Sequence, residues 1–240
     1  MSKLIKFLYT QSYKPGILGM FINPLYLLRR PLILHIKNLA PKLKGTLLDF
    51  GCGNKPYEHF FINANKYIGL DILTTGHDSR FVKADVYYDG KTIPFDNNSF
   101  DSIFCSEVLE HVFNIDEILQ EMHRVLKPGG LMLVTLPFCW NEHEIPYDFG
   151  RYTSYGLKYV MKKNNFEELE FYKSGNFISV IYQLHLLYIY EVLKKFKIVG
   201  MLITFLFTFP LNITGSILNH ILIKNDTFYF NNVILVKKSG

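Results

Sequence analysis

The residues with the clearest chemical potential form a glycine-rich turn, Gly51-Cys52-Gly53, directly after an apolar run. Glycines let a backbone approach a bound ligand closely because they carry no side chain. Asp71 ends a second apolar run about 20 residues further on, where a carboxylate can accept hydrogen bonds from both hydroxyls of a ribose. We expect the helix after the turn to offer its N-terminal amides to an anionic group. Together these features predict a site for a nucleotide-like ligand.

Asp49 narrows the choice of ligand because its carboxylate lies directly before the turn. It would repel a pyrophosphate by roughly one to several kcal/mol, whereas it would attract the ammonium group of a methionine moiety. The turn also lacks the third glycine that helps to accommodate a pyrophosphate, since Asn54-Lys55-Pro56 follow Gly53. Both observations favour S-adenosylmethionine over a dinucleotide.

These residues require a sheet that brings them together. Apolar runs predict five strands, at 46–50, 67–71, 81–84, 100–105 and 131–136. Apolar residues recur at helical spacing between 115 and 126, and Lys127-Pro128-Gly129-Gly130 is a strong stop signal. Strands that alternate with helices predict a parallel sheet covered on both faces. Ligands of such sheets bind at the carboxyl ends of the strands, so the loops that follow the strands converge on one site.

Taken in order, these segments resemble the motifs of class I S-adenosylmethionine-dependent methyltransferases, especially the small-molecule branch similar to the ubiquinone/menaquinone-biosynthesis type. The resemblance covers roughly residues 45–175. It rests on Leu47–Gly53, Asp71, Ala84-Asp85-Val86, Ile93–Asp101, Ser106–Val112 and Glu121–Gly130. The chain departs from the family at the third glycine of the first motif, which is Lys55. Its side chain either reaches the cofactor carboxylate or, as we favour, points into solvent.

The resemblance implies a Rossmann-like three-layer α/β sandwich with a mostly parallel seven-stranded sheet, and S-adenosylmethionine as cofactor. It implies that Asp71 binds the ribose and that Asp85 accepts a hydrogen bond from the exocyclic amine of adenine. The full set of cofactor-binding residues that we expect is Asp49, Gly51, Cys52, Gly53, Asp71, Ile72, Asp85, Val86, Ser106 and Glu107. Cys52 packs in the turn rather than acting as a nucleophile, because nothing near it in the sequence would generate a thiolate.

The loop after the fifth strand, 137–152, is the candidate for binding the methyl acceptor. As a pattern it resembles a methyltransferase subgroup often associated with cell-surface glycan gene clusters. We expect His143 to be the general base, oriented by Glu142 or Glu144. The alternative is that Asp148 and Arg151 form an ion pair that pins the loop and leaves His143 exposed. The acceptor-binding residues that we expect are His111, Trp140, Glu144, Tyr147 and Arg151.

His111 has two interpretations of its own. It follows Glu107 by four residues, which places both on one face of a helix. It either lines the acceptor pocket or caps and packs the start of that helix. No cluster of ligands in the sequence indicates a metal, and methyl transfer does not require one.

Composition excludes several classes of protein. The 240 residues are 49% apolar and 20% charged, as in a globular protein, and the net charge of +5 comes without a basic stripe, which argues against nucleic acid. Three widely spaced cysteines predict no disulfide framework and no zinc site, and fit a reducing, cytoplasmic compartment. Met1–Thr10 lacks the apolar core and cleavage site of a secretory signal.

We divide the chain into an N-terminal helical segment (1–43), a methyltransferase core (44–175), an apolar helical insertion (176–225) and a final strand of the core (226–240). In the first segment, Pro15, Pro24, Pro31 and Pro41 are expected to separate short helices. In the core, Thr153-Ser154 is expected to cap a helix, and 166–172 to form a sixth strand. The last strand is expected at 228–236.

The insertion is the most unusual segment. Ile198–Ile223 contains no Asp, Glu, Lys or Arg, and Pro210 and Gly215 are expected to interrupt it. The run is long enough to cross a bilayer, but the chain must return to complete the sheet. We therefore favour a shallow hairpin at the membrane surface, flanked by lysines that are attracted to anionic lipid. The alternatives are a soluble helical cover and a homodimer interface.

These features together predict an enzyme that moves a methyl group from S-adenosylmethionine to an oxygen, or else a nitrogen or carbon, of a small or lipid- or glycan-linked acceptor. It would work in the cytoplasm or peripherally on the inner face of the membrane. Two alternatives remain. One is a catalytically silent, methyltransferase-like binding module, and the other is a nucleotide-dependent dehydrogenase.

Overall fold

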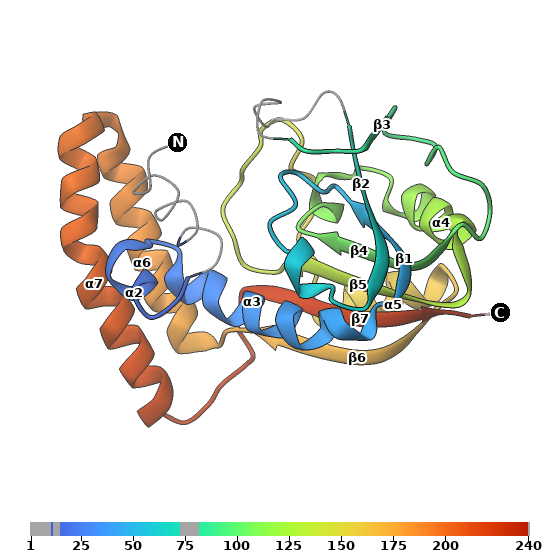
Figure 1. Ribbon diagram of the computed structural model, residues 1–240. Coiled ribbons are helices and arrows are strands. Elements are labelled where there is room, and N and C mark those ends of the chain that lie inside the picture. The colour runs from blue at the N-terminus through green and yellow to red at the C-terminus, as the bar shows by residue number, and fades with distance from the viewer. Residues whose placement is uncertain (1–10, 12–14, 73–81, 240) are drawn as a thin grey trace. The chain divides into compact units, whose positions relative to one another are not determined.

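A computed structural model of the chain describes residue 11, residues 15–72 and residues 82–239 (Figure 1). The chain divides into two compact units. The sheet unit comprises His35–Tyr172 and Asn231–Gly240, and the helical unit comprises Met1–Leu34 and Lys173–Phe230. The helical unit thus draws on both the N-terminal segment and the insertion. Part of the expected N-terminal segment, Met1–Thr10, lies outside the described residues.

The sheet has seven strands in the order β3-β2-β1-β4-β5-β7-β6. Their bounds are β1 Gly45–Phe50, β2 Ala64–Ile72, β3 Val86–Tyr88, β4 Phe100–Ser106, β5 Leu126–Pro137, β6 Phe166–Ser174 and β7 Asn231–Lys238. The four pairings from β3 through β2, β1 and β4 to β5 are parallel, and β7 pairs with β5 in antiparallel fashion. This arrangement confirms the mostly parallel Rossmann-like sheet.

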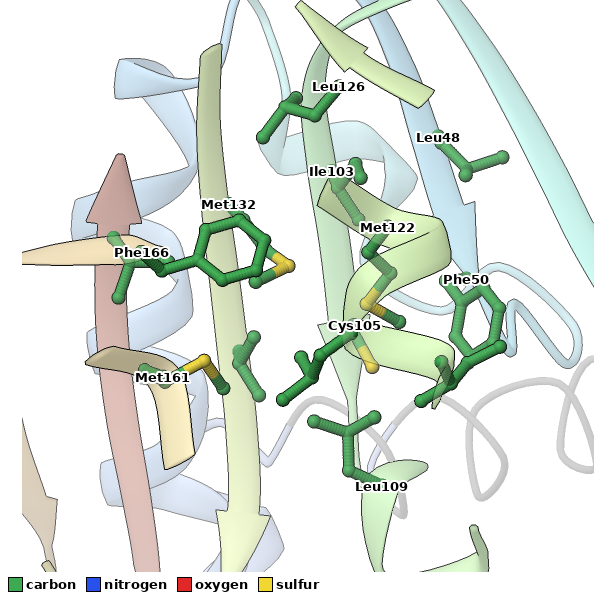
Figure 2. Close-up of a cluster of buried hydrophobic side chains, with 14 of the residues drawn as sticks. Leu48, Phe50, Ile103, Cys105, Leu109, Met122, Leu126, Met132, Met161 and Phe166 are labelled. Carbon is green, nitrogen blue, oxygen red and sulfur yellow. The ribbon is translucent and has the colours of Figure 1, made fainter. Parts of the chain in front are cut away.

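One face of the sheet is covered by α4 (Ile115–Val125) and α5 (Ser154–Lys163). The residues of α4 that recur at helical spacing are the buried ones, so the helix turns its apolar stripe to the strands. Figure 2 shows Met122 of α4 and Met161 of α5 among the side chains of this core, beside Ile103 and Met132 of the central strands. The predicted cap of α5 is present, because the Thr153 hydroxyl accepts the Gly156 N–H at 3.1 Å.

The opposite face is covered by aromatic residues and the end of a helix. The rings of Tyr57 and Phe61 pack on Phe104 of β4, with centroids 5.8 and 4.8 Å apart. Ile36 and Leu39, in the last part of α3 (Tyr26–Leu39), are also buried, and η1 (Ala40–Lys42) follows. Both faces are therefore covered, as a three-layer sandwich requires.

The connection from β1 to β2 corrects one prediction. No α-helix follows the glycine turn; the connection is a series of turns with one short 3-10 helix, η2 (Glu58–Phe60). A helix of this length offers no N-terminal anion site. The reason lies in the segment itself, which must bury Tyr57 and Phe61 against the sheet within a short connection that also contains Pro56.

Several element boundaries also differ from expectation, among them the start of β5, which is Leu126 rather than 131. The third strand is Val86–Tyr88 rather than 81–84. Before it, the Lys83 N–H bonds to the carbonyl oxygen of Gly53 in the glycine turn, and the Asp85 N–H bonds to that of Gly69 in β2. Phe81 lies outside the described residues. The last strand starts at Asn231, later than predicted. Pro31 does not end α3, and neither Pro210 nor Gly215 interrupts α7, because these helices run through them. A proline removes only one backbone donor, and the other bonds of a long helix remain.

The helical unit contains α2 (Gly19–Ile22) and a hairpin in which α6 (Phe177–Leu193) and α7 (Lys197–Ile221) are joined by η5 (Lys194–Phe196), as Figure 1 shows. The Asn176 side chain caps α6 by accepting the Ser179 N–H. The helices approach each other closely at the joined end, because a Cβ added to Gly200 would lie only 1.9 Å from the Leu193 carbonyl oxygen.

Candidate active site

The glycine turn after β1 depends on its glycines for two different reasons. Gly51 has φ +69°, and a Cβ there would lie 2.4 Å from a methyl of Val108. Gly53 has φ +50°, but a Cβ there would meet no atom of the described residues within 4 Å. The turn is thus packed against the loop after β4 at Gly51 and open at Gly53, the side on which a ligand can approach the backbone.

This contrast makes a paired prediction. Gly51→Ala should destabilise the chain by about 2–4 kcal/mol, because it adds a clash to an unfavourable φ. Gly53→Ala should cost about 1 kcal/mol, because only the φ penalty applies. Urea unfolding of both variants measures the difference. Equal losses would mean that the packing of Val108 on the turn is not as described.

Asp71 ties the end of β2 to this turn. Its Oδ2 accepts the Gly53 N–H at 2.8 Å and its Oδ1 accepts the Ile72 N–H at 2.8 Å. The residue is 7% exposed. The carboxylate thus lies at the end of β2, next to the open side of the turn, and its role as the ribose acceptor stays a prediction.

Asp49 is buried beneath the turn, at the middle of the sheet between β2 and β4. Its Oδ2 accepts a hydrogen bond from the Tyr67 hydroxyl at 2.6 Å. Burial raises the pKa of Asp49 to about 7, although the Tyr67 hydrogen bond and the charge of Lys55 act to lower it. A carboxyl in this state is stabilised by any cation that approaches, which fits the ammonium group of S-adenosylmethionine.

Lys55 corrects a further prediction, because it does not point freely into solvent. Its Nζ lies 2.5 Å from Oδ2 of Asp85, and its side chain is only 11% exposed. The same oxygen accepts the Gly69 N–H at 2.7 Å. Burial would raise the pKa of Asp85, but the hydrogen bonds from Lys55 and Gly69 outweigh it, so the pKa is lowered. Asp85 is therefore ionised and half exposed just before Val86, the first residue of β3.

Ser106 and Glu107 end β4 at the same edge of the sheet. The Ser106 hydroxyl lies 2.8 Å from the hydroxyl of Thr135. Glu107 has φ +56°, and its carboxylate accepts hydrogen bonds from Thr135 at 2.7 Å and from Asn231 at 2.6 Å. A positive φ at a non-glycine residue is a local strain of the kind that gathers at functional sites.

Glu107 and His111 do not share a helical face, which corrects the prediction made from their spacing. The positive φ of Glu107 lies outside the helical region, and His111 lies in the 3-10 helix η4 (Leu109–His111). Sequence reasoning also missed Thr135 and Asn231, which hold Glu107. Both are brought to it only by the tertiary arrangement of β5 and β7.

In the predicted acceptor loop, Asp148 and Arg151 form a two-pronged ion pair, with N–O distances of 2.6 and 2.7 Å. The hydrogen bonds from Arg151 lower the pKa of Asp148 to about 2. Arg151 also donates to the carbonyl oxygens of Trp140, at 3.4 Å, and Asn141, at 2.9 Å. This ion pair pins the loop, as the alternative interpretation of the sequence required.

His143 is nevertheless not free in solvent. Its ring lies 4.8 Å from the ring of His111, edge to face, and its N–H on the backbone donates to Asp148. Burial, and next the nearby His111, lower the pKa of His143, which favours the neutral imidazole. Nδ1 of His111 lies 2.7 Å from the carbonyl oxygen of Tyr147, whose own side chain is half exposed. Nε2 of His111 lies 3.7 Å from a carboxylate oxygen of Glu144.

Glu110 is a residue that the sequence did not single out. It lies in η4 beside His111 and is fully buried. Burial, and next the charge of Glu107, raise the pKa of Glu110 well above its ordinary value. Its backbone carbonyl accepts the N–H groups of Phe149 and Gly150, which holds the loop to the end of β4. The sequence pattern gave no indication that this glutamate is fully buried.

Of the residues predicted for the acceptor side, His111, Glu144, Tyr147 and Arg151 lie around His143, and Trp140 is tied to them through its backbone carbonyl oxygen. The residues predicted for the cofactor lie on or next to β1, β2, β3 and β4. Cys52 is buried, and burial raises the pKa of its thiol, so it is not a nucleophile. None of the three cysteines forms a disulfide.

Comparisons with known proteins agree with this fold and site. Residues 48–134 match the family model described as a methyltransferase domain. The ubiquinone/menaquinone biosynthesis C-methyltransferase UbiE of Pseudoalteromonas translucida is 41% identical over 91 residues, which are 37% of this chain and 35% of that protein. The mitochondrial 2-methoxy-6-polyprenyl-1,4-benzoquinol methylase of Mus musculus is 44% identical over 61 residues, 25% of this chain and 18% of that protein. The chain spans about a third of the length of the first curated relatives that it matches.

Solved structures show the same fold. A SAM-dependent methyltransferase from Archaeoglobus fulgidus superposes with a TM-score of 0.54 at 15% identity, covering 97% of this chain and 99% of that one. The [4+2]-cyclase SpnF gives a TM-score of 0.55 at 18% identity, covering 85% and 80%. Because one neighbour is named a cyclase, the fold by itself does not define the reaction.

The matched segment, which contains the glycine turn and its buried aspartate, is a methyltransferase domain, and its cofactor is S-adenosylmethionine. The segment is similar to the corresponding part of UbiE.

Proposed function

We propose that the whole chain transfers a methyl group from S-adenosylmethionine to an oxygen of a small or lipid- or glycan-linked acceptor. The observation that carries the proposal is Asp49, whose buried carboxylate would be stabilised by a nearby cation. It lies beneath a turn that is open at Gly53. A silent binding module would have no need of a second set of polar residues, gathered around His111 and His143, at the same edge of the sheet.

The residues divide the work between cofactor and acceptor. When bound, the cofactor supplies a methyl group already activated by its positive sulfonium. Asp49 would hold the ammonium end and Asp71 the ribose, while Asp85 and Val86 would border the adenine. The main task of the protein is then to hold the acceptor in line with the methyl group in a site without competing water. The residues for this task are those of η4 and of the loop that it anchors.

A general base is needed because a hydroxyl is a weak nucleophile. We propose His143 for this role in the metal-free chain, since it is neutral and half-buried. His143→Ala should lower turnover while leaving the affinity for S-adenosylhomocysteine unchanged. Tyr155→Ala, a change at an exposed residue of the same unit, is the control. Full activity of the His143 variant would remove this residue as the base.

The experiment that tests the overall proposal uses cofactor with an isotope-labelled methyl group. The purified chain is incubated with it and with a membrane-lipid extract, a glycan extract or neither, and labelled products are located by mass spectrometry. We expect a labelled product only with an extract, with its methyl group on oxygen. A methyl group on carbon or nitrogen would correct the acceptor atom, whereas no product from any extract would favour the binding module. Calorimetric titration with S-adenosylhomocysteine and with NAD distinguishes the dehydrogenase.

We further propose that the helical unit attaches the chain to the cytoplasmic face of a membrane. In a water-soluble helix the apolar stripe is buried and the polar face exposed, and α7 shows the reverse. Its buried residues are Gly200, Thr204, Thr208, Asn212 and Gly215. Its most exposed residues include Ile198, Leu202 and Leu206, at 69, 58 and 73%. Helices that pack together in lipid show this pattern, with small and polar residues facing inward and large apolar residues facing outward.

The buried polar groups of α7 find partners within the helical unit. The hydroxyls of Thr204 and Thr208 donate to the carbonyl oxygens four residues earlier, at 2.8 and 2.9 Å. The Asn212 amide donates to the carbonyl oxygens of Met20 and Asn23, both at 3.0 Å. The polar side chains that face inward therefore form hydrogen bonds within the helical unit. The outward face of α7 consists of apolar side chains, which an apolar medium would surround.

The length of the helical hairpin and the charges at its turn also fit a membrane surface. By length and composition, Phe177–Ile221 is apolar enough to cross a membrane, with a mean hydropathy of 1.7 in its best window, of which 22% is buried. Because η5 turns the chain back, the segment is a hairpin rather than a single crossing. Lys194, Lys195 and Lys197 gather at that turn, where they would contact anionic headgroups. A lipid-linked acceptor, such as the polyprenyl compound in the name of the mouse relative, would suit such a location.

Flotation with liposomes tests this attachment. The full chain should float with vesicles of phosphatidylglycerol and phosphatidylcholine. A variant with serine at Ile198, Leu202 and Leu206 should remain at the bottom, because it loses three of the strongly exposed apolar side chains of α7. The matched control carries serine at Ile62, Tyr155 and Tyr159, which are equally exposed in the sheet unit, and should float. If the full chain stays in solution as a dimer, the apolar face is a homodimer interface instead.

A further inference from the structure

Two segments that are distant in the sequence place three metal-binding side chains together. Glu110 and His111 belong to η4, and His143 belongs to the loop after β5. One ligand atom from each lies within 4.8 Å of the others. The sequence did not reveal this group because 32 positions separate His143 from His111.

The first argument for a ligand at this position is the carboxyl group of Glu110. Its side chain is completely buried, and neither of its oxygens accepts a hydrogen bond from any described residue. The nearby Glu107 differs, because both of its oxygens are satisfied by Thr135 and Asn231. Buried polar groups without partners are rare and costly in native proteins, so each requires an explanation. A cation bound to the carboxylate would supply one.

The second argument is the orientation of His111. Its Nδ1 lies 2.7 Å from the Tyr147 carbonyl oxygen, a contact in which Nδ1 carries the proton and donates it. Nε2 then presents its lone pair, and this buried atom has no hydrogen-bond partner among the described residues. It lies 3.8 Å from Oε1 of Glu110 and 3.7 Å from Oε2 of Glu144. A lone pair facing carboxylate oxygens is repelled unless a cation lies between them.

The third argument is that His143 has the surroundings of a metal-binding histidine. Its Nδ1 lies 3.3 Å from the Asn141 carbonyl oxygen, 3.3 Å from Oδ2 of Asp148 and 3.3 Å from Nη2 of Arg151. In metal sites the second ring nitrogen of a histidine typically donates to a carbonyl or carboxylate in this way, which leaves Nε2 for the metal. Both histidines of this group therefore have an oxygen partner on the Nδ1 side.

We propose that Glu110, His111 and His143 form a binding site for a divalent transition-metal ion, with zinc as the best match. Two imidazoles and one carboxylate are a common set of protein ligands for zinc, which binds them at about 2.0–2.2 Å. An ion at this distance would draw the three ligand atoms, which lie within 4.8 Å of one another, closer together; Nε2 of His111 and Oε1 of Glu110 are already 3.8 Å apart. The fourth position would remain for Glu144, water or the acceptor. The ion would fasten the acceptor loop to the end of β4.

This site does not depend on the proposed methyl transfer, since metal binding can be measured without cofactor or acceptor. It does change the role of His143. With an ion bound, its Nε2 is a ligand and cannot accept a proton, so it is available as a base only in the metal-free chain.

Metal titration of the full, tag-free chain, stripped with EDTA and then freed of chelator, tests the site. We expect one Zn²⁺ per chain by calorimetry, a rise in the thermal midpoint, and visible absorption bands when Co²⁺ is bound. Glu110→Gln, His111→Gln and His143→Gln should each weaken binding about tenfold or more, as loss of metal-site groups does. His220→Gln, a change at an exposed histidine of the helical unit, should leave binding unchanged.

Two results would overturn the proposal. One is the absence of saturable binding of Zn²⁺ and Co²⁺, which would leave a proton shared by His111 and the carboxylates as the explanation of the cluster. The other is binding that none of the three substitutions weakens. Circular dichroism checks the folding of each variant. If Glu110→Gln does not fold, His143→Gln in the more exposed loop provides the comparison.

Discussion

Asp49→Asn is expected to stabilise the cofactor-free chain by about 2–4 kcal/mol at pH 8 while weakening the binding of S-adenosylmethionine. Burial holds the pKa of Asp49 at about 7, some three units above that of an exposed aspartate. The ionised form is therefore penalised in the folded chain. The asparagine keeps an oxygen that can accept the Tyr67 hydroxyl but never carries the charge.

The pH dependence follows from the direction of this shift. Because the folded pKa is raised, the stability linked to protonated Asp49 is fully present below pH 4 and is lost as the pH rises to about 7. The advantage of the variant should therefore appear above pH 4 and reach its maximum above pH 7. Urea unfolding at several pH values measures it, with Asp226→Asn, at an exposed carboxylate, as the control.

Cofactor binding should show the opposite trend in the wild-type chain. The ammonium group binds the ionised carboxylate, so affinity should rise with pH up to about 7 and then level off. Asp49→Asn should lack this rise and bind about tenfold or more weakly at pH 8. A variant that binds the cofactor like the wild type at pH 8 would show that Asp49 does not face the ammonium group.

Asp71→Ala is expected to weaken binding of S-adenosylhomocysteine by about 1–3 kcal/mol, or roughly 5- to 150-fold. Two effects combine, because the carboxylate is the predicted ribose acceptor and also holds the Gly53 N–H. Calorimetry measures the affinity, and Asp226→Ala serves as the control.

The two effects of Asp71 can be separated. Asp71→Asn keeps one oxygen, which can accept the Gly53 N–H, but it loses the second oxygen, which accepts the Ile72 N–H, and it cannot accept two charge-assisted hydrogen bonds from a ribose. It should therefore bind more weakly than the wild type while unfolding at a higher urea concentration than Asp71→Ala. Unchanged affinity in both variants would mean that the ribose site is elsewhere.

Much of the fold was predictable because it depends on local patterns. The apolar runs at β1, β2, β4 and β5 and the helical spacing of α4 are short-range signals, and each appears where the sequence indicated. The cap at Thr153 was visible for the same reason. The predictions that were wrong involve competition with distant residues. The segment after Gly53 buries Tyr57 and Phe61 and forms no α-helix, and the backbone N–H of Lys83 bonds to Gly53 of the glycine turn rather than to a neighbouring strand.

The sequence by itself determined the class of domain, because a glycine turn, its preceding aspartate and Asp71 are read in order along the chain. The tertiary structure alone decided how each charge is held. It buried Asp49 beside Tyr67, paired Lys55 with Asp85, and gathered Glu110, His111 and His143 from segments that are far apart. A sequence records which groups are present, whereas burial and distance set the free energy of each charge, and both arise only when the chain is folded.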